Sequence, residues 1–197
     1  TFFLSYEDVE SYDVLTTKFN SDGTKIWEQR YQHVGYLNSS FIAYDREGNC
    51  YITFSYDLQF AQSGSSNIFT VKYDVSGVQQ WVAEFNGPAN EWDEPSGIAT
   101  DDSGNVFVAG NSGNYGVILK YDSLGNQRWV KYSNSGGGSI VLDNAGNIYV
   151  GGSYVSKYNS TGLRLWKSSY NSWVIALDNG GNLILYQDSL VKLNGAT

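Results

Sequence analysis

The chain has 197 residues, of which 41% are hydrophobic and 16% are charged, and its formal net charge is −8. This composition argues against a disordered chain, and the acidic balance disfavours nonspecific nucleic-acid binding and docking on anionic lipid. No apolar run is long enough for a membrane span, and a single Cys50 and a single His33 exclude a disulfide framework and a multi-Cys or His-rich metal centre.

Short segments rich in aromatic and β-branched residues follow one another along the whole chain, and helical periodicity is nearly absent. Turn-forming residues separate the segments, as expected of antiparallel strands. We predict eighteen strands, near residues 2–6, 13–19, 26–31, 41–45, 50–55, 68–73, 80–85, 97–101, 106–110, 117–121, 127–132, 139–143, 148–151, 154–158, 164–168, 174–178, 183–186 and 190–193.

Two turn motifs recur between these strands. The first is Lys, then an aromatic residue, then Gly, then Trp, and the Trp always lies four residues after the Gly. Its four complete copies contain Lys18, Gly23 and Trp27; Lys72, Gly77 and Trp81; Lys120, Gly125 and Trp129; and Lys157, Gly162 and Trp166. A fifth copy begins at Lys192.

The second motif is Asp-x-x-Gly-Asn, and an apolar strand follows each copy. It begins at Asp45, Asp101, Asp143 and Asp178. The Asp side chain can accept hydrogen bonds from backbone N–H groups of the turn, and Gly can adopt the left-handed conformation that returns the chain. Both motifs therefore predict tight hairpins, and the aspartates are turn caps rather than a ring of metal ligands.

Four-stranded antiparallel units in tandem predict an all-β fold, a β-propeller with about five blades. Successive motif lysines are 54, 48, 37 and 35 residues apart, a drift that we attribute to loops. The blade cores are expected near residues 2–31, 41–85, 97–132, 139–168 and 174–193, within a single propeller domain or segment. The first unit lacks its first strand and the last unit lacks its last strand, which favours a segment of a larger propeller over a ring closed with incomplete blades.

Length variation is confined to connections on one face of the predicted propeller. The long connections lie near residues 7–12, 32–40, 56–67 and 86–96. Insertions on one face of a repeat protein usually mark its binding face. Within the same set, Ser135-Gly136-Gly137-Gly138 is predicted to be a flexible loop.

The sequence of Asp-x-x-Gly-Asn, an apolar strand and Lys-Tyr-Asp-x-x-Gly-x-x-x-Trp resembles the bacterial SBBP-type propeller repeat. The clearest copies are residues 101–129 and 143–166. The Gly-x-x-x-Trp ending is similar to the tryptophan-docking motif of PQQ-type propellers. That resemblance implies packing between adjacent blades for Trp27, Trp81, Trp129 and Trp166.

The chain departs from the PQQ-type pattern in two ways. The position before each motif Gly is Asp22, Ser76, Leu124 or Thr161, whereas the docking motif usually has Thr there. PQQ-dependent dehydrogenases resemble larger rings with vicinal cysteines, and this chain has only Cys50. We therefore expect no quinone and no other cofactor.

Paired carboxylates occur outside the repeat positions in the segment from Asn90 to Glu94. Glu91, Asp93 and Glu94 flank Trp92, an arrangement that could hold Ca²⁺, with Glu91 and Asp93 as ligands, or act on a glycosidic bond. A solvated acidic loop is the competing interpretation. No Ser-His-Asp pattern or phosphate-binding loop is recognisable, so no catalytic residue is assigned.

Aromatic residues in the variable connections favour a non-catalytic binding or assembly module that takes a protein partner or a glycan, or that self-assembles. The candidate binding residues are Tyr36, Tyr56, Phe60, Glu91, Trp92, Asp93, Glu94 and Tyr115. The acidic charge and the glycosylation-type triplets at Asn38 and Asn159 favour an extracellular or periplasmic location. The alternative is a propeller hydrolase or lyase that acts on a saccharide through the acidic residues of segment 86–96.

Overall fold

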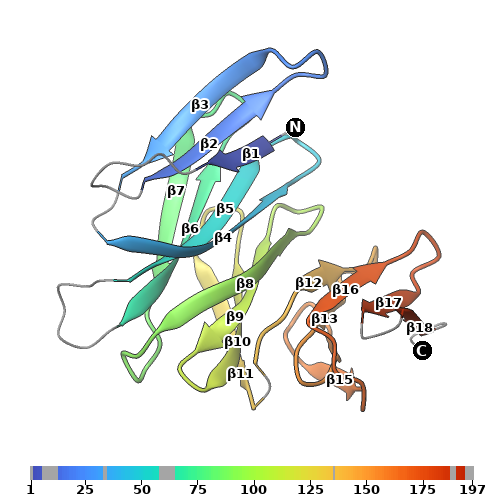
Figure 1. The fold of residues 1–197 in the computed structure, drawn as a ribbon. Coiled ribbons are helices and arrows are strands. Elements are labelled where there is room, and N and C mark those ends of the chain that lie inside the picture. The colour runs from blue at the N-terminus through green and yellow to red at the C-terminus, as the bar shows by residue number, and fades with distance from the viewer. Residues whose placement is uncertain are drawn as a thin grey trace.

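The computed structural model describes residues 2–5, 13–32, 35–57, 65–134, 136–186 and 190–193. In these residues eighteen strands form five antiparallel sheets, and no helix is present (Figure 1). Three sheets have four strands and the first and last have three, and strand order in space follows chain order. The predicted all-β architecture of four-stranded antiparallel propeller blades is confirmed. We number the sheets blades 1 to 5.

The strands divide among the blades as follows. Blade 1 contains β1 (Phe2–Ser5), β2 (Val14–Phe19) and β3 (Lys25–Tyr31). Blade 2 contains β4 (Tyr36–Tyr44), β5 (Cys50–Asp57), β6 (Ser66–Tyr73) and β7 (Gln79–Phe85). Blade 3 contains β8 (Asp93–Thr100), β9 (Val106–Ser112), β10 (Tyr115–Tyr121) and β11 (Gln127–Ser133). Blade 4 contains β12 (Ile140–Leu142), β13 (Ile148–Val150), β14 (Ser156–Tyr158) and β15 (Arg164–Lys167). Blade 5 contains β16 (Val174–Leu177), β17 (Leu183–Tyr186) and β18 (Leu190–Leu193).

The blades differ in strand length more than the sequence suggested. β4 has nine residues and β8 has eight, whereas β12 has three. Residues 36–40 and 93–96, predicted to lie in long connections, form the first halves of β4 and β8. The drift in repeat length therefore comes partly from strands and not only from loops.

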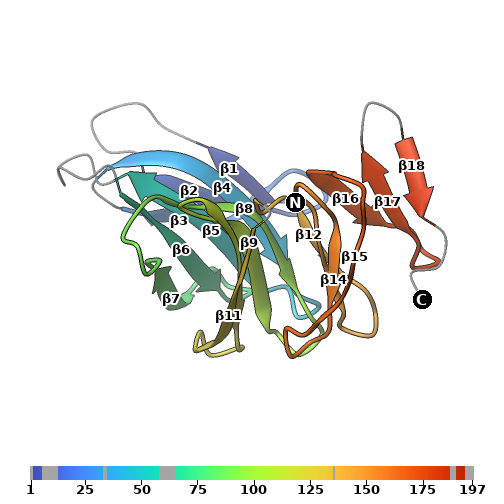
Figure 2. The same cartoon turned by 90° about the horizontal axis from the view of Figure 1, so that it is seen from below.

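The blades follow one another in chain order, from blade 1 at the top of Figure 1 to blade 5 at its right. Seen from below, blades 4 and 5 stand to the right of blade 3, and blade 1 lies behind blade 2 (Figure 2). The first strands of neighbouring blades are adjacent, β4 to β8, β8 to β12 and β12 to β16. The Ser39 hydroxyl donates to the carbonyl of Pro95 at 3.3 Å, and the Ser96 hydroxyl donates to that of Gly138 at 2.9 Å. Serines on β4 and β8 thus link blade 2 to blade 3 and blade 3 to the segment that leads into blade 4.

The two predicted turn motifs adopt one geometry. In the turn after β12, the Asp143 Oδ1 atom accepts hydrogen bonds from the backbone N–H groups of Ala145 and Asn147, at 3.0 and 2.8 Å. Gly146 has φ of +76°, a conformation that only glycine adopts readily. The turn after β10 repeats these bonds around Asp122. All these turns lie at the same end of the blades, which we call the turn face; the connections at the other end form the loop face.

The core lies between the blades. Phe69, Val71 and Tyr73 of blade 2 pack with Val14 and Trp27 of blade 1, and equivalent clusters join each later pair of blades. Fully burying such a side chain contributes roughly 1.5–3 kcal/mol. The repeated interfaces therefore supply most of the hydrophobic stabilisation.

The motif tryptophans lie at these interfaces. A Cβ atom added to Gly77 would stand 2.8 Å from Cγ of Trp27, and one added to Gly125 would stand 2.7 Å from Cδ2 of Trp81. The indole N–H of Trp27 donates to the carbonyl of Val75, and that of Trp81 donates to the carbonyl of Ser123, each at 3.1 Å. The Trp of one blade thus packs on the turn glycine of the next.

The motif lysines reach the same turns. Lys18 Nζ donates to the Val75 carbonyl at 3.4 Å and Lys120 Nζ donates to the Ser160 carbonyl at 3.2 Å. Lys120 also lies over the ring of Phe107, with its Nζ 5.0 Å from the ring centroid. These lysines therefore join neighbouring blades, which explains their recurrence without a ligand.

Candidate functional site

The acidic segment of the loop face is built around a buried carboxylate. Asp93, the first residue of β8, has 0% relative exposure, and its Oδ2 atom accepts the backbone N–H of Gly87 at 2.6 Å. Burial raises the pKa of Asp93, against the hydrogen bonds from the Ser112 hydroxyl and Gly87 N–H, which lower it. Asp93 thus fastens the connection 86–92 to blade 3.

This geometry separates the paired carboxylates. Asp93 and Glu94 are successive residues of one strand, so their side chains point to opposite faces of the sheet. Two carboxylates must flank the same bond to hydrolyse a glycoside. Asp93 and Glu94 cannot act as such a pair.

The remaining residues of the segment are accessible. Trp92 is 44% exposed, Glu91 is exposed and Glu94 is half-buried. The carbonyl of Trp92 accepts the backbone N–H of Gly113 at 2.8 Å, which joins this segment to the β9–β10 hairpin. Tyr115, on that hairpin, is 54% exposed. The structure therefore brings these candidate residues together at the loop end of blade 3.

Two other candidates, Tyr56 and Tyr36, lie elsewhere in the described part of the chain. Tyr56 belongs to β5 and is fully buried, with its ring centroid 5.4 Å from that of Phe54, so its assignment to a surface loop was wrong. The strand runs two residues beyond the predicted end and points Tyr56 into the core. Tyr36 is the first residue of β4 rather than part of a loop. Phe60 lies outside the described residues, as does His33.

The described part of the chain contains no group of three or more His, Cys, Asp or Glu side chains placed to hold a metal ion. A hollow of about 350 Å³ on the turn face is lined by Asp101, Asp102 and Asp143. Asp101 and Asp143 cap their own turns, and Asp102 pairs with Arg46 at 2.8 Å. The carboxylates of this hollow are thus engaged by the protein itself.

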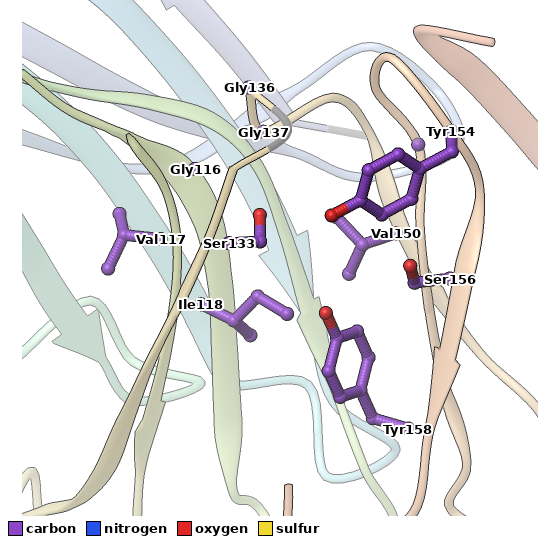
Figure 3. Close-up of a pocket in the computed structure, with 11 residues that line it drawn as sticks. Gly116, Val117, Ile118, Ser133, Gly136, Gly137, Val150, Tyr154, Ser156 and Tyr158 are labelled. Carbon is purple, nitrogen blue, oxygen red and sulfur yellow. The ribbon is translucent and has the colours of Figure 1, made fainter. Parts of the chain in front are cut away.

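A small cavity lies between blades 3 and 4 on the loop side (Figure 3). The hydroxyl groups of Tyr154 and Tyr158 point into it, and Ser133 and Ile118 face them. Its volume is about 10 Å³, enough for one water molecule and too small for a ligand. This cavity therefore cannot be the ligand site.

Trp173 is a surface residue that the sequence analysis did not single out. It immediately precedes β16 on the loop face and is 54% exposed. A Cβ atom added to Gly136 would stand 2.9 Å from Cη2 of Trp173, so the edge of the indole lies close to the glycine segment 136–138. The signal in the sequence was its position, because Trp173 is one of two tryptophans outside the Gly-x-x-x-Trp motif.

The glycine segment 136–138, which was predicted to be a flexible loop, is packed against its neighbours. The backbone N–H of Gly137 donates to Oδ1 of Asn111 at 2.9 Å, and that of Gly138 donates to the carbonyl of Gly151 at 3.0 Å. Close approach of backbones leaves no room for side chains at these positions. Blade 3, the segment and Trp173 are therefore continuous on the loop face.

The comparisons with known proteins agree with this fold. Residues 80–116 match the model of the SBBP beta-propeller repeat, which confirms the resemblance seen in the turn motifs. No curated protein matches the sequence.

Several solved propellers are similar in structure. BBS1N in complex with ARL6DN gives a TM-score of 0.63 and 14% identity, over 100% of this chain and 65% of that chain. Virginiamycin B lyase from Staphylococcus aureus, a catalytically inactive variant with quinupristin, gives 0.61 and 13%, over 100% and 75%. BamB from Moraxella catarrhalis gives 0.58 and 17%, over 91% of this chain and 52% of that chain.

These likenesses define the class of protein as a β-propeller. The chain spans about half the length of BamB and about two thirds of BBS1N. One of these propellers was solved in complex with another protein and one is a lyase, so the shared fold accommodates both binding and catalysis. The described residues contain no helix long and apolar enough to cross a membrane.

Proposed function

We propose that this chain is a non-catalytic binding module whose loop face takes a protein partner or a carbohydrate. The observation that carries the proposal is the gathering of exposed aromatic side chains on this face: Trp92, Tyr115 and Trp173 are 44%, 54% and 54% exposed. Large aromatic side chains left in water are characteristic of binding surfaces, because their burial against a partner releases free energy.

Two further observations support binding over catalysis. Asp93 caps the connection 86–92 from a buried position, and Glu94 points to the opposite side of the strand. The similar BBS1N structure was solved in complex with ARL6DN, so a propeller of this shape can hold a protein. An extracellular or periplasmic location is part of the proposal, supported by the net charge of −8.

The test is a binding screen on a glycan array and on immobilised candidate proteins. A triple variant, W92A/Y115A/W173A, should lose whatever the wild-type chain binds. The matched control is L124A/L163A, which removes side chains that are 76% and 64% exposed on the turn face, and it should bind normally. Equal binding by both variants would overturn the proposal. So would saccharide turnover by the wild type that Glu91→Ala abolishes.

A further inference from the structure

We propose that Trp173, Asn111 and Glu94 form a subsite for a neutral pyranose saccharide. The inference rests on the proposed function and narrows its partner to a sugar. It assigns the stacking surface to Trp173 and the hydroxyl contacts to the other two side chains.

The backbone around Trp173 is fixed on both sides. The Trp173 carbonyl accepts the N–H of Ser139 at 2.9 Å, and the preceding Ser172 exchanges two backbone hydrogen bonds with Gly152, at 2.7 and 3.0 Å. The Ser172 hydroxyl donates to the carbonyls of Val174 and Tyr186, at 2.6 and 2.8 Å. The indole is therefore presented by a rigid segment, and little conformational entropy is lost when a ligand covers it.

The indole itself is shaped for stacking. The edge of its six-membered ring lies against Gly136, which has no side chain, and more than half of the residue remains in solvent. An aromatic ring that is held at its edge by backbone and is 54% exposed offers solvent a flat apolar area of one residue. The C–H face of a pyranose ring matches such an area, since it is also flat, apolar and small.

Asn111 lies beside this area, close to Gly136, and Glu94 lies beside Asn111. Asn111 Oδ1 accepts the Gly137 N–H at 2.9 Å, which orients the amide; no partner for its Nδ2 group is found among the described residues. Glu94 pairs directly with Asn111 across β8 and β9, so both side chains lie on one face of the sheet. Directly opposed residues have Cβ atoms about 4.5–5.5 Å apart. An amide donor and a carboxylate acceptor at that spacing suit neighbouring hydroxyl groups.

Charge narrows the class of saccharide. Glu91 and Glu94 lie at this end of blade 3, and the chain carries a net charge of −8. Uronic acids and sulfated sugars would be repelled, whereas neutral hexoses would not. A protein partner would be expected to need a broader apolar centre than one indole beside three glycines.

The experiment measures quenching of tryptophan fluorescence and calorimetric titration with soluble neutral hexasaccharides of glucose, mannose, galactose and N-acetylglucosamine. At least one should bind saturably to the wild-type chain. Trp173→Ala should weaken its affinity about tenfold or more, and Trp173→Phe should restore part of the loss. Glu94→Gln, which keeps a hydrogen-bonding oxygen, should weaken it less than Glu94→Ala. Leu124→Ala on the turn face is the matched control.

The outcomes separate the subsite from the proposed function. If a saccharide binds and Trp173→Ala binds it equally well, the subsite is wrong and the binding module stands. If no saccharide binds but an immobilised protein does, and W92A/Y115A/W173A loses it, the sugar specificity is wrong and the binding module stands. Unchanged thermal unfolding of Trp173→Ala shows that lost binding is not lost folding.

Discussion

The turn face and the loop face of this propeller connect the same strands, but they are built from different kinds of residue. On the turn face, a repeated Asp or Asn caps each hairpin, and the turn glycines of blades 2, 3 and 4 receive the Trp of the preceding blade. On the loop face no connection repeats, and the exposed aromatic residues Trp92, Tyr115 and Trp173 stand outside the motif positions. Residues that recur at the motif positions stabilise the blades. Residues outside the motif positions are not needed for the contacts between blades. The contrast makes predictions that differ between the two faces.

The largest loss in the free energy of unfolding is expected from a substitution at Gly125. Gly125→Ala forces a Cβ into the indole of Trp81, 2.7 Å away, and strains a residue with φ of +84°. The matched control is Gly146→Ala, which has φ of +76° and nothing within 4 Å of the added atom. Backbone strain should cost each variant about 1 kcal/mol, and overpacking should cost Gly125→Ala about 1–3 kcal/mol more. Urea denaturation measures both, and equal losses would show that the Trp contact is not tight.

The next effect is expected at Asp93 on the loop face. Asp93→Ala removes the acceptor of the Gly87 N–H and should lower the free energy of unfolding by about 1–3 kcal/mol. Proteolysis should then cut the connection 86–92 faster. Glu91→Ala, an exposed carboxylate in the same connection, is the control and should change neither. A stable Asp93→Ala chain would refute the fastening role of this residue.

Acidic pH should reduce the stability that the capping aspartates of the turn face contribute. Burial opposes ionisation of Asp45 and Asp143, but hydrogen bonds from Asn49 and Tyr51, and from Asn147 and Tyr149, outweigh it and hold each pKa below its ordinary value of 3.8. A carboxyl whose pKa is depressed by folding stabilises the native state above its unfolded pKa, and this is lost as pH falls through the folded pKa. Asp93, with a raised pKa, works in the opposite direction.

Urea midpoints measured from pH 6 down to pH 2 test this effect. The wild type should lose stability most steeply below pH 3.8, and the variant D45N/D143N should show a flatter profile in that range. An unchanged slope would mean that these hydrogen bonds do not favour the charged form.

The smallest effect on stability is expected at Trp173. Its side chain is 54% exposed, so Trp173→Ala should change the free energy of unfolding by less than about 0.5 kcal/mol, as surface substitutions usually do. Trp81→Ala removes a partly buried indole from a blade interface and should cost about 1–3 kcal/mol. Comparable losses in the free energy of unfolding of the two variants would contradict the proposed difference between the two faces.

The sequence predicted the features that depend on local chemistry. Asp143 and Gly146 specify a hairpin through their own hydrogen bonds and conformation, so the turns, the eighteen strands and the blade order followed from the motifs. The sequence predicted strand ends and burial less well where contacts with neighbouring blades determine them. β5 continues to Asp57 because blades 1 and 3 cover it, which moves Tyr56 from a loop into the core.

The candidate site shows the same limit. Glu91, Asp93 and Glu94 look equivalent in sequence, and only the start of β8 at Asp93 decides which of them is buried. Trp173 was detectable by elimination, since it stands outside every repeat. Its neighbours Gly136 and Asn111 lie more than thirty positions earlier in the chain, and only the docking of blade 4 brings them together.

The joint between Trp81 and Gly125 has a consequence for how such a chain can grow. Blade 2 carries a Trp that docks forward and a glycine turn that receives the Trp from behind. A duplicated gene segment that encodes one blade would therefore bring both halves of the joint with it. Copies could be added or lost by recombination without designing a new interface, while their loop-face connections diverge independently. The same logic makes a single blade a natural unit for grafting a new recognition surface onto this scaffold.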